Sequence, residues 1–140
     1  VSLPHSYFLF DQAGNVQPQS EWRNWQDPEY YLGQLEYTNR RILEAVDSIL
    51  AHDPGAVIIL QSDHGARLGY HLKELYDAPY DAETETIYQQ NILNCVYWGG
   101  EELDISGLSG VNTLRTILNA TYGTEYELLP QPTGFVNYFE

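Results

Sequence analysis

The sequence is poor in cysteine and in basic residues. Its single cysteine, Cys95, excludes an internal disulfide, so the fold must depend on its core or on a partner. Only 6 Lys and Arg residues stand against 20 Asp and Glu residues, which gives a formal net charge of −14. Nucleic acid needs a basic surface, and an anionic membrane surface repels such a chain. We therefore expect neither as a partner.

Long apolar runs are also absent. No stretch reaches the roughly 18 to 20 apolar residues that a membrane-spanning helix needs, and no signal peptide precedes the fold. The chain starts at Val1 without an initiating Met, which suggests an excerpt from a longer protein, whose membrane anchoring and compartment stay open. With 140 residues, 43% of them hydrophobic, we expect one domain over residues 1–140.

Two helices are predicted from apolar residues that recur every three or four positions. The first runs from about Pro28 to residue 50, after Asp27 and before a Pro-Gly turn. The second follows Ser109 as its N-cap, continues to about residue 122, and ends at Gly123. His52, at the end of the first helix, is expected to meet the helix carbonyls.

Two strands are predicted from short apolar runs at residues 57–61 and 92–98. Runs of this kind suit strands covered on both faces of a parallel α/β sheet. We expect Cys95, within the second run, to be buried and inert. Residues 66–85 between the runs lack clear periodicity, which favours a long functional or mobile loop.

The first apolar run ends in Asp63, His64 and Gly65. Open α/β sheets bind ligands at the carboxyl ends of their strands. A carboxylate beside an imidazole suits zinc or manganese better than calcium, which prefers oxygen ligands. Gly65 would let the backbone turn sharply. The alternative is that Asp63 caps the turn and His64 packs beside it.

Three further residues follow this turn and bear on the charge or ligands of the site. Arg67 and Lys73 could offset the acidic field that would otherwise repel a phosphate or sulfate ester. His71 could be another metal ligand, although a surface histidine is the simpler interpretation.

The order and the residues of several segments resemble the carboxyl-terminal half of a sulfatase-like protein of the alkaline phosphatase superfamily. The most specific segment is residues 57–65, because Asp63-His64-Gly65 follows a helix and a strand. The other matching segments are Pro4-His5, residues 8–14, 31–39, 92–94, 111–119 and 128–130. The resemblance implies a partial three-layer α/β/α domain with a mostly parallel sheet, the carboxyl-terminal portion of an alkaline phosphatase-like fold.

The resemblance also implies that Asp63 and His64 bind a divalent metal. Manganese or zinc is expected, with calcium and magnesium as alternatives. His5 matches a histidine that contacts substrate in phosphoglycerol transferase-like relatives, so His5, with Arg67, is a candidate for binding the anionic ester. The implied reaction is attack on a phosphate or sulfate ester by a Ser or Thr alkoxide, or by a formylglycine.

The sequence departs from that family in one decisive respect. The nucleophile, its Cys-x-Pro-x-Arg setting in true sulfatases and the amino-terminal acidic ligands belong to an earlier half that this chain lacks, and Cys95 does not replace them. We therefore expect that this chain holds no catalytic residue and is catalytically inactive by itself. Its expected partner is the missing amino-terminal part of the same protein. The alternative is a non-catalytic module whose exposed aromatics, including Trp22 and Trp25, bind a partner or form a homodimer.

Overall fold

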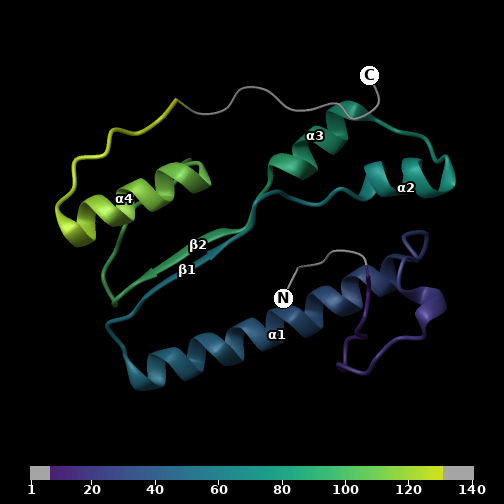
Figure 1. Cartoon of the computed structure of the whole chain (residues 1–140), viewed down its shortest axis with the longest axis horizontal. Coiled ribbons are helices and arrows are strands. Elements are labelled where there is room, and N and C mark those ends of the chain that lie inside the picture. Colours follow the sequence, from purple (N-terminus) through teal and green to yellow (C-terminus); the bar gives the residue numbers. More distant parts are fainter. Residues whose placement is uncertain (1–6, 131–140) are drawn as a thin grey trace. The chain divides into compact units, whose positions relative to one another are not determined.

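A computed structural model describes residues 7–130 of the chain (Figure 1). Over these residues the protein is mixed α/β, with four helices and one two-stranded sheet. The elements are η1 (Gln19–Glu21), α1 (Pro28–His52), β1 (Val57–Gln61), α2 (Leu68–Tyr76), α3 (Ala82–Gln90), β2 (Asn94–Trp98) and α4 (Gly110–Tyr122).

The chain divides into two compact units, which alternate along the sequence. The first comprises residues 1–54 and 68–80, and therefore contains α1 and α2. The second comprises residues 55–67 and 81–140, and contains β1, α3, β2 and α4. A single domain over residues 1–140 stays a prediction.

Helix α1 confirms the predicted helix and its boundaries. The Asp27 side chain accepts a hydrogen bond from Glu29 N, and Pro28 occupies the first turn, where it costs no helical hydrogen bond. At the other end, His52 Nδ1 lies 2.7 Å from Ser48 O, so the imidazole meets a helix carbonyl as expected. These local signals were sufficient to define the helix.

Helix α4 confirms the second predicted helix. Ser109 accepts from Asn112 N, and Gly123 ends the helix in the left-handed region at a φ of 64°. The Asn112 side chain is buried and exchanges two hydrogen bonds of 2.8 Å with the Leu129 backbone. This pair ties the segment after α4 back to the helix.

The sheet corrects the predicted strand direction. Strands β1 and β2 pair antiparallel, with Val57 opposite Trp98 and Gln61 opposite Asn94, and the described residues contain no parallel pair. Nor is β1 covered on both faces in this part of the chain, because Ile58 is buried whereas Ile59 remains 36% exposed. The prediction of a mostly parallel sheet is wrong here, since a short apolar run indicates burial but not the direction of its neighbour.

Residues 66–85 also differ from the prediction. Instead of one long loop, they form all of α2 and the start of α3. Asp81 caps α3 by accepting from Glu83 N. At the end of α2, Lys73 and Asp77 form an ion pair, and Asp77 takes a positive φ of 52°. Each of these helices has only nine residues, so the three- and four-residue spacing repeats too few times to stand out in the sequence.

The first unit is organised around an aromatic cluster formed by Phe8, Trp25, Tyr31 and His71. Phe8 packs edge-on against Trp25 with ring centroids 4.6 Å apart, and the His71 ring stacks on Trp25 at 4.2 Å. Phe8 and Trp25 are buried, and the His71 side chain is 15% exposed. The expectations of an exposed Trp25 and a surface His71 are therefore wrong, because α2 brings His71 onto the indole ring.

The Cys95 side chain is exposed over the described residues, which contradicts the expected buried thiol.

Among residues 7–130, every helix is too short or too polar to span a bilayer.

Candidate functional site

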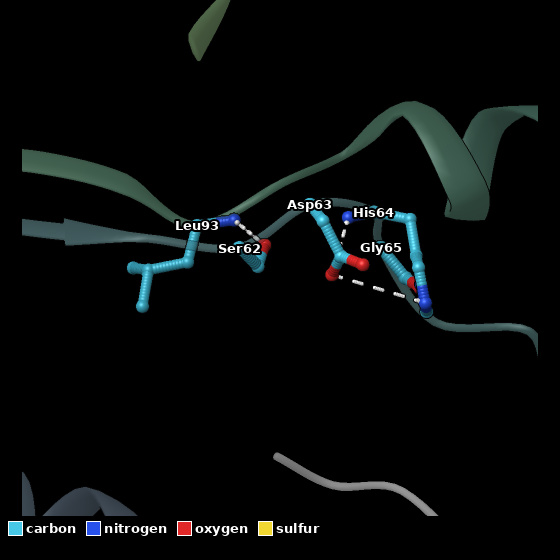
Figure 2. Close-up of polar contacts among 5 residues, drawn as sticks. All are labelled: Ser62, Asp63, His64, Gly65 and Leu93. Carbon is cyan, nitrogen blue, oxygen red and sulfur yellow. Dashed lines mark hydrogen bonds and ion pairs between the residues drawn. The ribbon is translucent and has the colours of Figure 1, made fainter. Parts of the chain in front are cut away.

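The candidate site is the turn that follows β1, from Ser62 to Gly65. Ser62 N donates to Leu93 O at 2.9 Å. Leu93 N donates to the Ser62 hydroxyl oxygen at 2.9 Å, as Figure 2 shows. In a regular antiparallel pair both acceptors are backbone carbonyls. Here the Ser62 side chain replaces one of them, and the chain leaves the ladder at Asp63.

The other end of the turn is held by the end of α3. Gly65 N donates to Gln89 O at 2.7 Å. A Cβ at Gly65 would lie 1.9 Å from Tyr88 O, so any other residue would collide with the backbone of α3. The φ of Gly65 lies outside the left-handed region. Gly65 is therefore required by close approach to α3 rather than by the sharp turn that the sequence suggested.

The Asp63 and His64 side chains project to the same side of this turn (Figure 2). His64 Nε2 lies 3.9 Å from Asp63 Oδ1. The Asp63 side chain is 91% exposed and that of His64 is 25% exposed. Asp63 Oδ1 also accepts from His64 N at 3.1 Å, so the expected capping role is present as well. A carboxylate has about four acceptor positions, so capping leaves room for a further interaction.

The tautomer of His64 is set by its second contact. His64 Nδ1 lies 2.7 Å from Gly65 O, and because a carbonyl only accepts, Nδ1 must carry the proton. In the neutral ring Nε2 then keeps its lone pair, which is the form that binds metals. Two electron-pair donors, His64 Nε2 and Asp63 Oδ1, thus lie on the same side of the turn.

The spacing of these two atoms is close to, but longer than, that of two ligands on one metal ion. Typical zinc bonds to nitrogen and oxygen are each about 2.0 to 2.2 Å, which sum to about 4.2 Å. That sum holds only for a straight ligand–metal–ligand line, whereas a tetrahedral ion places two ligand atoms about 3.4 Å apart. The 3.9 Å between His64 Nε2 and Asp63 Oδ1 is longer, so the exposed Asp63 carboxylate must move closer before both atoms bind one ion. Among residues 7–130, no third His, Cys, Asp or Glu joins them in a metal-binding group. The described residues therefore contain two candidate ligands and no group of three.

The two predicted substrate-binding residues are placed differently. Arg67 lies two residues after the turn and is half-buried, immediately before α2. His5 lies outside the described residues. The pairing of these two side chains around a substrate stays a prediction.

Comparison with known proteins adds no relative. No protein-family model, curated protein or solved structure matches the chain. The geometry of the turn is therefore the main support for a functional assignment.

Sequence reasoning missed the groups that hold the turn. These are the Ser62 hydroxyl and the backbone of residues 89–93. A serine directly before the Asp-His pair was the one available signal. The role of the backbone at 89–93 depends on the location of α3, which no local pattern gives.

Proposed function

We propose that this chain is part of a metal-dependent phosphate- or sulfate-ester hydrolase or transferase, to which it supplies Asp63 and His64 as metal ligands. The observation that carries the proposal is the convergence of His64 Nε2 and Asp63 Oδ1, with the His64 proton held on Nδ1. A neutral imidazole and a carboxylate together carry one negative charge, which suits a divalent cation of the manganese or zinc type.

The chemistry assigned to these residues is binding and charge placement. A bound divalent metal would supply positive charge to activate a nucleophile and stabilise the anionic ester oxygens. Asp63 and His64 would hold that charge at the end of β1. Arg67, on the same turn-to-helix connection, would add a fixed positive charge for the anionic ester in a chain of net charge −14. The nucleophile lies in the amino-terminal part, so the isolated chain is inactive.

The finer fold assignment belongs to the same proposal. We assign residues 1–140 to the carboxyl-terminal portion of an alkaline phosphatase-like domain, a three-layer α/β/α fold. The antiparallel β1–β2 pair is compatible with it, because large parallel sheets commonly carry an antiparallel edge strand. β1 would then pair on its other edge with parallel strands of the missing part, which would also cover Val57 and Ile59.

The test is ester hydrolysis by the full-length protein that contains this chain. Phosphate and sulfate esters are supplied with manganese or zinc, and Asp63→Ala and His64→Ala are compared with wild type. We expect each variant to lose at least about 100-fold in activity, since changes even to outer-shell partners cost about 10- to 100-fold. His52→Ala and Asp104→Ala are the matched controls, because they remove an exposed histidine and an exposed aspartate from other elements.

Retention of activity in both ligand variants would contradict the proposal. Metal-dependent turnover by the isolated chain, abolished by Asp63→Ala, would contradict the claim that the nucleophile lies outside this chain. No activity and no bound metal in the full-length protein would favour a second candidate, a non-catalytic module that binds a partner or a second copy. The observation that favours this module is an exposed apolar stripe on α4, formed by Val111, Leu114, Leu118 and Tyr122.

A further inference from the structure

The turn that carries Asp63 and His64 is attached to one short backbone segment, residues 89–93. Ser62 contacts Leu93 before the ligand pair, and Gly65 contacts Gln89 after it. The two potential ligands are thus the only residues between two anchoring points. Because Asp63 is 91% exposed, packing of its own side chain does little to fix its position.

The contact at Ser62 differs from an ordinary end of a strand. The sheet register ends with Gln61 opposite Asn94, and Leu93 would be the next position to share a ladder bond with Ser62. Leu93 N instead donates to Ser62 Oγ at 2.9 Å. Because the Ser62 hydroxyl accepts this hydrogen bond, Leu93 N keeps a partner even though the Ser62 carbonyl no longer accepts from it.

The contact at Gly65 also limits the orientation of the His64 imidazole. Gly65 N donates to Gln89 O, and Gly65 O accepts from His64 Nδ1. Fixing the Gly65 backbone therefore fixes the acceptor that keeps the proton on Nδ1. Outer-shell acceptors of this kind set the tautomer and ring orientation of metal-binding histidines.

We propose that Ser62 is a positioning residue for the Asp63–His64 pair, acting through its hydroxyl bond to Leu93 N. This inference rests on the proposed metal-binding function but makes a separate claim. Loss of the hydroxyl would leave Ser62 attached to Leu93 only through its backbone N–H bond to Leu93 O, so that His64 and Asp63 sample more arrangements. Metal binding would then require their ordering, which lowers affinity.

The experiment compares Ser62→Ala, Ser62→Thr and wild type in the full-length protein. Affinity for manganese and zinc is measured by titration calorimetry, the ring tautomer of His64 by ¹⁵N NMR without metal, and stability by urea unfolding. We expect Ser62→Ala to bind metal about 10- to 100-fold more weakly, with a mixed His64 tautomer. Ser62→Thr keeps a hydroxyl and should restore both. Ser48→Ala, at an exposed position of α1, is the matched control.

Three outcomes would overturn the inference. The first is unchanged affinity and tautomer in Ser62→Ala. The second is a loss of stability that accounts for the loss of affinity, with no change of tautomer. The third is failure of Ser62→Thr to restore the tautomer. If wild type and Asp63→Ala bind metal equally poorly, the proposed function fails, whereas the tautomer measurement still decides whether Ser62 positions His64.

Discussion

The turn after β1 and the aromatic cluster of the first unit each contain a histidine, but they hold it in opposite ways. His71 lies flat on the Trp25 ring at 4.2 Å and is held by side-chain packing. His64 is held by a backbone carbonyl and lies beside a carboxylate that is 91% exposed. Packing gives burial and stability, whereas backbone anchoring presents polar side chains at low cost to the rest of the fold. The two histidines therefore differ in what fixes the ring, a neighbouring aromatic side chain for His71 and a backbone carbonyl for His64.

The largest expected effect comes from breaking the packed region at Trp25. Trp25→Ala removes an indole that is 4% exposed and contacts Phe8, Tyr31 and His71. The free energy of unfolding should fall by about 3 to 5 kcal/mol, as is typical of buried aromatics. Urea unfolding followed by far-ultraviolet circular dichroism measures it.

The matched control for that change is Tyr122→Ala. Tyr122 is also aromatic but is 74% exposed, so its removal should change the free energy of unfolding by no more than about 0.5 kcal/mol. Equal losses in the two variants would contradict the assignment of Trp25 to the core.

A smaller loss is expected from breaking the anchored turn at Gly65. In Gly65→Ala the new methyl would meet Tyr88 O at 1.9 Å, and a backbone atom cannot move aside without distorting α3. The cost should be about 1 to 3 kcal/mol, as for other overpacked sites. Urea unfolding measures this loss, and the ¹⁵N tautomer signal of His64 should change with it.

Gly110→Ala is the control for steric crowding. A Cβ at Gly110 would lie 2.9 Å from the Gln61 side chain, which can move aside only by giving up its hydrogen bonds to Asn94 and Gly110. The free energy of unfolding of Gly110→Ala should fall by about 1 to 2 kcal/mol, whereas the His64 signal should stay close to wild type. A similar change of the His64 signal in the two glycine variants would show that α3 does not fix the turn.

The smallest effect is expected from the pH dependence of α3. The Thr84 hydroxyl, followed by the backbone N–H groups of Glu83 and Thr84, lowers the pKa of Asp81 below its ordinary 3.8. A lowered folded-state pKa gives stability above pH 3.8 that is lost as the pH falls through the folded value. Asp81→Asn keeps an acceptor at the N-cap but no titrating carboxyl.

The stability of Asp81→Asn should therefore fall less steeply than that of wild type below pH 3.8. Urea unfolding at a series of pH values measures the slope, with Asp47→Asn on exposed α1 as the control. An identical slope in wild type and Asp81→Asn would show that the cap carries no pH dependence.

The same contrast explains what the sequence could predict. Asp27, Ser109 and Gly123 are local signals, because a cap needs only its neighbours, and the two longest helices are defined by them. The identity of the candidate ligands was also visible, since Asp63 and His64 are adjacent in the chain.

What the sequence could not predict depends on distant partners. The antiparallel direction of β2 is set by pairing between residues more than thirty positions apart, such as Gln61 and Asn94. The need for glycine at position 65 arises from Tyr88, which belongs to α3. Cys95 was expected to be buried from its apolar neighbours alone, yet its exposure depends on what lies over β2.

The exposure of Cys95 also has a practical consequence. Because the sequence has no other cysteine, a maleimide fluorophore or spin label would attach at one defined place without engineering. That place lies on β2, directly opposite Leu60 in the sheet register. The native chain therefore carries its own labelling site, opposite a residue of β1 that lies three positions before Asp63.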